Sequence, residues 1–226
     1  MGKIKNEIDS VTVKRYGLDA GARVTGIAAA DDFGAAPDGF RPVDVLEGCV
    51  SVIIMGYPFP RDAIINDTAE YITIRNGVNE KISNIAKDVA KRIRDEGYRT
   101  KVITGMGGKW VNKESHGLIS LKHAAELAGL GTIGKNYLLT NPEYGNLLWF
   151  SAVLTDAYLV PDEKVRLSIC DGCDICVTTC PSGALDDPSS FNRKRCSDTM
   201  FRIADKKWEI GCYLCRRSCP YRFGVV

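Results

Sequence analysis

The sequence predicts an α/β domain over residues 1–160, followed by a small cysteine-rich module over residues 161–226. Apolar, β-branched runs alternate with segments of helical periodicity up to about residue 160. Eight of the nine cysteines then lie between Cys170 and Cys219, which puts a composition boundary near Pro161. With 226 residues, of which 45% are hydrophobic, the chain can bury the core that a globular protein needs.

Two apolar runs and one helical pattern open the first domain. The runs VTGIAA (24–29) and CVSVIIMGYPF (49–59) are typical of buried strands, because they are rich in β-branched residues and prolines end the second. Apolar residues recur at helical spacing over 80–97, and Gly97 is a suitable stop for that helix.

Three further elements complete the domain. RTKVITG (99–105) predicts a strand, SLKHAAELAGL (120–130) a helix, and NLLWFSAVLT (146–155) a long central strand. Because strands alternate with helices, we expect a layered and mostly parallel sheet.

Charge and hydropathy exclude several classes of partner. A net charge of +2 gives no strong attraction to nucleic acid or to an anionic membrane, so a nucleic-acid partner is not expected. The N-terminus lacks a secretory pattern, and no run approaches the roughly 18 apolar residues of a membrane span. We therefore expect a cytoplasmic protein with no membrane partner. Thiols stay reduced there, so dense cysteines indicate metal or redox chemistry rather than disulfides.

Two glycine-rich segments resemble phosphate-binding loops without their context. AGLGTIGKN (128–136) has G-x-G-x-x-G spacing and nearly completes a P-loop, but it follows a helical pattern, whereas both motifs follow a strand. TGMGGKW (104–110) lacks the first P-loop glycine and is expected to be a loop after a strand. Neither segment is assigned to a nucleotide.

The run CDGCDICVTTCP (170–181) carries the strongest signal. Its spacing lets one short loop place Cys170, Cys173 and Cys176 around one iron–sulfur cluster, while Cys180, followed by proline, turns away. In two-cluster bacterial ferredoxins the corresponding fourth cysteine serves the other cluster.

The run CYLCRRSCP (212–220) repeats the pattern incompletely, because Glu209 stands where its first cysteine would be. By the same logic Cys219 reaches back to the first cluster, and Cys196 is the cysteine left in this region to complete the second. The first cluster is assigned Cys170, Cys173, Cys176 and Cys219, and the second is assigned Cys180, Cys196, Cys212 and Cys215.

The assignment has one alternative, and two other features of the sequence need an interpretation beside it. A pair of four-cysteine zinc sites is possible, although zinc favours paired knuckles over three thiolates in one loop. Cys49, alone in an apolar strand, is interpreted as a small buried residue. Ten lysines and arginines from Arg166 onward, Arg216 and Arg217 among them, either offset cluster charge or form an ordinary solvated face.

The segment HAAELAGLGTIGKNYLLTNPEYGNLLWFSAVLTD (123–156), followed by the two cysteine runs, resembles the epoxyqueuosine reductase and corrinoid reductive dehalogenase superfamily. The similarity extends loosely upstream to 49–59 and 79–98. It implies a nitroreductase-like α/β domain that holds base-off cobalamin, with a ferredoxin-like module of two [4Fe-4S] clusters that pass electrons to the cobalt. It also implies that Cys196 ligates the second cluster.

The resemblance further implies a corrinoid role for the glycine segment. Its candidate cofactor-binding residues are Gly129, Gly131, Gly134, Lys135 and Asn136. Glycines would let backbone approach a flat macrocycle, and the two polar side chains would donate hydrogen bonds to its periphery. Tight packing at the end of a helix is the competing explanation for the glycines.

The sequence departs from the superfamily at its proton donor. The acidic residue that epoxyqueuosine reductases carry before the glycine segment is replaced by Ser115, beside His116, and the twin-arginine signal of the dehalogenases is missing. The candidate donors His116, His123, Tyr57, Tyr71 and Tyr137 are not distinguished by sequence, so no catalytic residue is assigned.

These observations favour an anaerobic oxidoreductase, a corrinoid-dependent reductase of unidentified small-molecule substrate. It would receive electrons from a low-potential donor such as a ferredoxin or flavodoxin. The alternative is a non-catalytic electron carrier or corrinoid-activating partner. A flavin in the α/β domain is a further possibility.

Overall fold

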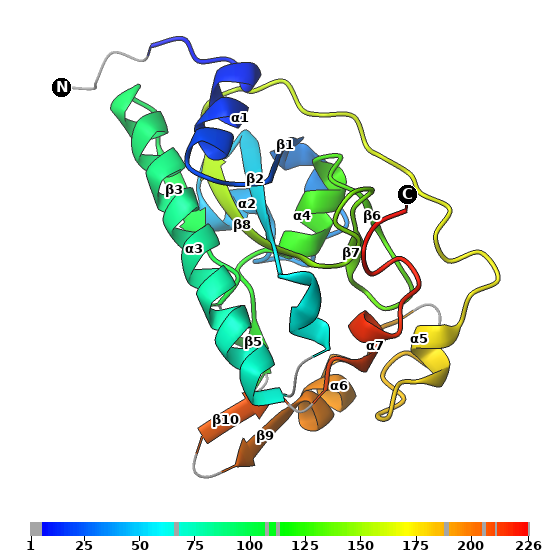
Figure 1. Ribbon diagram of the computed structural model, residues 1–226. Helices are drawn as coiled ribbons and strands as arrows, with labels where there is room; N and C mark the ends of the chain where they lie inside the picture. The colour runs from blue at the N-terminus through cyan, green and yellow to red at the C-terminus, as the bar shows by residue number, and fades with distance from the viewer. Residues whose placement is uncertain are drawn as a thin grey trace. The chain divides into compact units, whose positions relative to one another are not determined.

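A computed structural model describes residues 6–65, 68–106, 109–111, 114–187, 190–204, 207–210 and 212–225 (Figure 1). The helices are α1 (Ser10–Asp19), α2 (Pro42–Val45), α3 (Thr68–Asp95), α4 (Leu121–Leu127), α5 (Ile175–Thr178), α6 (Arg193–Met200) and α7 (Leu214–Arg217), with 3-10 turns η1 (Ala30–Phe33) and η2 (Arg61–Ile64). The strands are β1 (Val24–Ala29), β2 (Ser51–Pro58), β3 (Thr100–Ile103), β4 (Lys109–Val111), β5 (Glu114–His116), β6 (Thr132–Ile133), β7 (Leu139–Thr140), β8 (Leu148–Thr155), β9 (Phe201–Ala204) and β10 (Lys207–Ile210).

The chain folds into two compact units built from interleaved segments. The α/β unit consists of Met1–Tyr57, Asn79–Leu130 and Trp149–Val165. The cysteine unit consists of Pro58–Val78, Gly131–Leu148 and Arg166–Val226. Because the cysteine unit also draws on two earlier segments, the division at residue 160 stays a prediction.

The main sheet has the strand order β1-β2-β8-β3, and it is antiparallel. β1 pairs antiparallel with β2, and β3 pairs antiparallel with β8. Beside these pairs, the Val50 amide donates to the Thr155 carbonyl at 2.8 Å and the Phe59 amide to the Leu147 carbonyl at 2.8 Å, so β2 and β8 also run in opposite directions. The prediction of a mostly parallel sheet is wrong.

The reason lies in the place of β8. β2 and β3 point the same way and are joined by α3, which is the crossover that alternating strands and helices predict. β8 arrives later in the chain and lies between them, so each adjacent pair becomes antiparallel. Alternation of element types predicts layers, but it does not reveal which strand will be inserted where.

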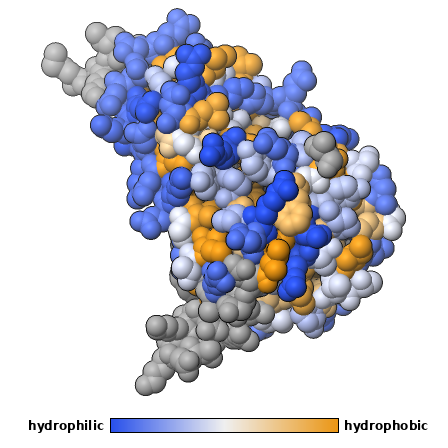
Figure 2. All heavy atoms as spheres, viewed as in Figure 1, coloured by the Kyte–Doolittle hydropathy of each residue, from blue (hydrophilic) through white to orange (hydrophobic). Residues whose placement is uncertain are grey.

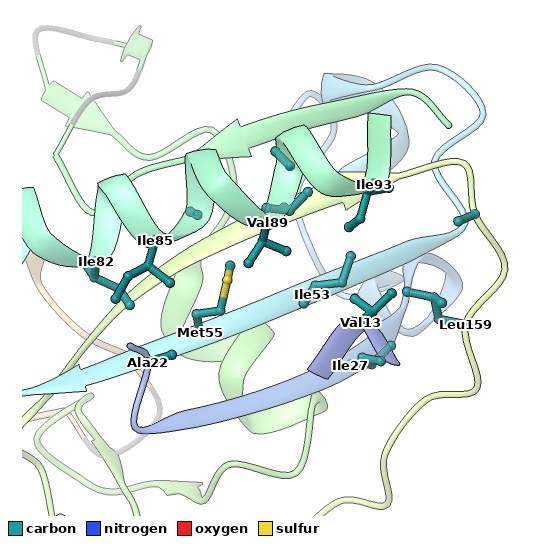
Figure 3. Packing of buried hydrophobic residues seen from close by; sticks show 14 residues of the cluster. Val13, Ala22, Ile27, Ile53, Met55, Ile82, Ile85, Val89, Ile93 and Leu159 are labelled. Atoms are coloured by element: carbon teal, nitrogen blue, oxygen red, sulfur yellow. The ribbon is translucent and has the colours of Figure 1, made fainter. Parts of the chain in front are cut away.

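Helix α3 covers one face of the sheet through a regular apolar stripe. Ile82, Ile85, Val89 and Ile93 are all buried, at the three- and four-residue spacing that puts side chains on one helix face. Figure 3 shows this stripe pointing at β2, where Met55 belongs to the same core cluster. The periodicity found over 80–97 therefore identified the buried face, although α3 starts earlier, at Thr68.

Helix α1 adds to this core and was not predicted from the sequence. Asp9 caps its first turn by accepting a hydrogen bond from the Thr12 amide at 2.7 Å, and Val13 is fully buried in the α3 cluster. On β1, Gly26 allows the end of α4 to approach closely, since a Cβ there would lie 2.4 Å from the Ala128 carbonyl oxygen. Helices thus cover both faces of β1.

The exposed surface of α1 is mixed, because the apolar residues Val11 and Leu18 are exposed on it. In Figure 2, hydrophilic residues dominate the surface over the C-terminal part of α3. This is the outer face expected of amphipathic helices. Among the described residues, no helix has the length and apolar character needed to span a membrane.

Replacing Ile53 by Ala should lower the free energy of unfolding by about 2–5 kcal/mol, because the side chain is fully buried and the change leaves a cavity. Val11→Ala, at a position that is 63% exposed, should change it by less than about 0.5 kcal/mol. Chemical denaturation measures both. Equal losses for the two variants would contradict the core described above.

Candidate metal centre

The hairpin β6–β7 carries the glycine segment to the first cysteine run. Thr132 pairs with Thr140 and Ile133 with Leu139. The turn between the strands closes through the Gly134 amide, which donates to the Leu138 carbonyl at 3.0 Å. The residues GKN (134–136) therefore form the tip of a hairpin, and their contacts are made with cysteine-bearing segments.

Four cysteine side chains line one cavity in the cysteine unit. They are Cys170, Cys173, Cys176 and Cys219. The other lining residues are uncharged: Gly134, Asn136, Thr140, Ile169, Pro220 and Tyr221. The cavity thus combines three sulfurs from the first run with the last sulfur of the second run, in a setting without carboxylates.

The thiols of this group influence one another electrostatically. Burial raises the pKa of Cys176, and the neighbouring thiolates of Cys170, Cys219 and Cys173 raise it further. Burial also raises the pKa of Cys219, although an amide at Tyr221 lowers it. The thiols of Cys176 and Cys219 therefore resist ionisation, and a positively charged metal core would reverse that preference.

A second group consists of Cys196, Cys212 and Cys215. Burial raises the pKa of Cys215 to about 11. The charge of Arg216 lowers this pKa, and the thiolates of Cys196 and Cys212, and of Cys176 from the first group, raise it further. Cys196 belongs to α6, Cys212 follows β10, and Cys215 lies in α7. Glu209, at the position of the absent cysteine, lies in β10.

Cys180 has a different environment from the other seven. Its Sγ lies 3.4 Å from the Ser182 hydroxyl. Burial raises the pKa of Cys180, but hydrogen bonds with Ser182 and with the amides of Ala184 and Leu185 outweigh burial and lower the pKa below its ordinary value.

Among the described residues, no group of three or more Cys, His, Asp or Glu side chains has the geometry for a single metal ion.

The two runs repeat one local structure. Asp174 precedes α5 and its carbonyl accepts from the Thr178 amide at 3.0 Å, while Tyr213 precedes α7 and its carbonyl accepts from the Arg217 amide at 3.0 Å. The hydroxyls of Thr179 and Ser218, just after the two helices, lie 3.2 Å apart. The shared spacing of the runs therefore produces matching short helices that pack together.

The hairpin tip holds both runs. The Lys135 amide donates to Cys170 Sγ at 3.3 Å, and its Nζ donates to the Cys173 carbonyl at 3.0 Å. Asn136 is buried, donates from Nδ2 to the Cys215 carbonyl at 3.2 Å and accepts from the Leu138 amide at 3.1 Å. A Cβ at Gly134 would lie 3.2 Å from Cys170 Sγ, so glycine permits this approach.

Gly129 and Gly131 have protein neighbours of their own. Gly129, at φ +71°, ends α4 in a Schellman motif, since its amide donates to Glu126 and the next amide donates to Ala125. A Cβ at Gly131, where φ is +151°, would lie 2.1 Å from the Thr140 carbonyl oxygen. Helix termination and close packing account for both glycines, and corrinoid contact by the segment stays a prediction.

Asn146 and Arg216 are polar residues of this unit that the motif search did not single out as site residues. Both are buried. The Asn146 Nδ2 donates to the Arg216 carbonyl at 3.2 Å, and the Arg216 guanidinium donates back to the Asn146 carbonyl. The side-chain amide of Asn146 also acts to lower the pKa of Cys219. Asn146 stands in no recognised motif, so spacing gave no signal for it. Arg216 lies within the run CYLCRRSCP and was already named among the basic residues of that module.

The remaining candidates are dispersed. Cys49 is buried before β2, and burial raises its pKa to about 11. The Tyr57 hydroxyl accepts from Lys81 Nζ at 2.8 Å. Tyr71 is buried with its ring 4.4 Å from that of Tyr213.

Tyr137, at φ +54°, stacks on Phe191 with ring centroids 5.1 Å apart. His123 Nδ1 lies 2.6 Å from the Ser120 hydroxyl. The side chains of Ser115 and His116 lie outside what the structure describes. No proton donor is therefore distinguished.

Comparison with curated sequences confirms the resemblance to epoxyqueuosine reductases. The enzyme of Bacillus subtilis (strain 168) is 31% identical over 118 residues, which cover 48% of this chain and 30% of the relative. That of Lactococcus garvieae (strain Lg2) is 27% identical over 209 residues, which cover 82% of this chain and 55% of the relative. The matched segments thus cover only 30% to 55% of these relatives' length. No protein-family model matches the chain.

Solved structures share the fold. A selenomethionine-labelled epoxyqueuosine reductase aligns with TM-score 0.66 at 22% identity, over 94% of this chain and 65% of that one. An epoxyqueuosine reductase with a modified tRNA stem loop aligns with TM-score 0.61 at 22% identity, over 94% and 64%. A reductive dehalogenase, described with a mechanism for B12-dependent dehalogenation, aligns with TM-score 0.57 at 20% identity, over 88% and 27%.

Replacing Asn136 by Ala should lower the free energy of unfolding by about 1–3 kcal/mol, because it leaves the Cys215 carbonyl and the Leu138 amide without their partner. The exposed Asn84→Ala variant is the matched control and should be near neutral. Chemical denaturation compares the two. An Asn136→Ala protein as stable as the control would show that the hairpin tip does not brace the runs.

Proposed function

We propose that this chain is an iron–sulfur redox protein that holds two [4Fe-4S] clusters. The observation that carries the proposal is the cavity lined by Cys170, Cys173, Cys176 and Cys219, because it unites exactly the sulfurs that ferredoxin spacing assigns to one cluster. The proposed ligands of the second cluster are Cys180, Cys196, Cys212 and Cys215. The last three are the second group of cysteines described above.

The residues of the cavity fit such a cluster. Thiolate is the ligand that iron–sulfur clusters use, and the uncharged lining leaves the sulfurs as the donors. The Lys135 amide already points at Cys170 Sγ, and hydrogen bonds to sulfur are one means by which proteins set cluster potentials. When bound, the clusters supply one-electron transfer. The protein holds the sulfurs and partly shields them from water.

The finer proposal is a corrinoid-dependent reductase. It is supported by similarity to epoxyqueuosine reductases and by the shared fold with a dehalogenase whose described mechanism is B12-dependent. A bound corrinoid would supply the bond chemistry. The proposed contacts are Gly129, Gly131, Gly134, Lys135 and Asn136, and the GKN tip among them already contacts the cysteine runs. A ferredoxin or flavodoxin is the proposed electron donor.

Two other functions are kept. A non-catalytic electron carrier or corrinoid-activating partner would need the clusters alone.

RNA is a candidate substrate because a solved epoxyqueuosine reductase holds a tRNA stem loop, which weighs against our expectation of no nucleic-acid partner. The balanced charge of this chain predicts that any RNA binding depends on shape and base contacts more than on phosphate attraction.

The anaerobically purified protein should contain about eight iron atoms and eight acid-labile sulfides per chain. Cys196→Ser should lose or distort one cluster, and Cys49→Ser should keep both, because Cys49 belongs to the α/β unit and the eight proposed ligands belong to the cysteine unit. Iron analysis and EPR spectroscopy measure both variants. Zinc in place of iron would end the redox proposal, and an unchanged Cys196→Ser spectrum would end the assignment of that ligand.

The reduced protein should bind one cobalamin in the base-off form. Anaerobic titration with cob(II)alamin, followed by EPR spectroscopy, measures this. A base-on signal together with free loss of the corrinoid on dialysis, in protein whose clusters are present, would reject the reductase and favour the electron carrier. Binding of a tRNA stem loop, tested by mobility shift in the same preparation, would favour an RNA substrate over a small molecule.

A further inference from the structure

Arg216 is a buried arginine between two cysteines of the second run. Its side chain is 6% exposed, and it lies in α7 directly after Cys215 and three residues before Cys219. The guanidinium donates to the Asn146 carbonyl and lies 5.1 Å from the centre of the Phe59 ring. Within the described part of the chain, neither of these contacts is a carboxylate.

A buried guanidinium needs an opposite charge. Arginine stays protonated in proteins, so it cannot escape burial by losing its proton as lysine or histidine can. A carbonyl and an aromatic face stabilise a cation, but they carry no net charge to neutralise it. An unpaired charge inside a protein is strongly unfavourable, and such charges are therefore normally paired.

The cysteines beside Arg216 supply the missing charge once they are ligated. Four thiolates give a bound cluster net negative charge, and reduction adds more. A fixed cation next to the cluster therefore stabilises the reduced form more than the oxidised form. Net charge and burial are among the factors that set cluster potentials.

The neighbouring arginine shows that this environment is specific to one position. Arg217 follows in the same helix, and its side chain is exposed. Water and salt screen an exposed charge, so its effect on a cluster is weak. Arg216 and Arg217 thus differ in environment at adjacent positions: the first charge is buried and the second is solvated.

We propose that the buried charge of Arg216 raises the reduction potential of the cluster held by Cys215. This inference rests on the proposed presence of the clusters. It predicts that the two clusters differ in potential partly because this cation lies beside one of them.

The test is a redox titration of both clusters, monitored by EPR spectroscopy, in the full-length protein. Iron and sulfide are measured first in the wild type, so that absence of clusters rejects the proposed function itself and, with it, this inference. Arg216→Gln should lower the midpoint potential of one cluster and leave the other near its wild-type value. Arg216→Lys should retain most of the wild-type potential, because it keeps the charge. Arg217→Gln is the matched control and should shift neither midpoint.

Several results would overturn the proposal while the clusters remain. These are unchanged midpoints in Arg216→Gln, equal shifts in the Gln and Lys variants, or an equal shift in Arg217→Gln. If Arg216→Gln loses iron, the Arg216→Lys variant distinguishes two explanations. Assembly of both clusters in the lysine variant supports a requirement for positive charge. Loss of iron in the lysine variant as well rejects the proposal and favours a structural role for Arg216 in holding Asn146.

Discussion

Four cysteine side chains face one cavity, and this convergence has an electrostatic cost. The neighbouring thiolates add to the effect of burial in raising the pKa of Cys176, so the sulfurs do not gather through attraction for one another. The surrounding chain has to hold them. It does so with backbone hydrogen bonds in the runs, and with a hairpin tip that contacts Cys170 through Lys135 and the other run through Asn136. These contacts come from backbone and side-chain atoms of the chain itself, and they bring segments of both cysteine runs next to the hairpin tip.

Sequence periodicity identified the helices and strands that turn one set of side chains toward the core. β1 spans the residues expected, 24–29, and the spacing of Ile82, Ile85, Val89 and Ile93 identified the buried stripe of α3. The direction of the sheet could not be predicted in this way. β8 is recognised as an apolar strand by its own residues, but its insertion between β2 and β3 depends on packing across the whole unit.

The candidate site shows the same division. Cysteine spacing anticipated that Cys219 would lie with Cys170, Cys173 and Cys176, because short loops fix where neighbouring sulfurs point. The contacts that Asn136 and Asn146 make with the second run could not be predicted, since those partners lie 70 or more positions away along the chain. Arg216 and Arg217 are chemically identical in the sequence, and tertiary burial alone separates them.

The interleaved construction of the cysteine unit also bears on how such a module is inherited. A segment from Arg166 onward contains both runs, but it lacks Phe59, the GKN tip and Asn146, all of which contact them. A fragment that carries the runs alone would therefore lack these contacts. Transfer of the intact module to another protein would need all three separated pieces of chain at once.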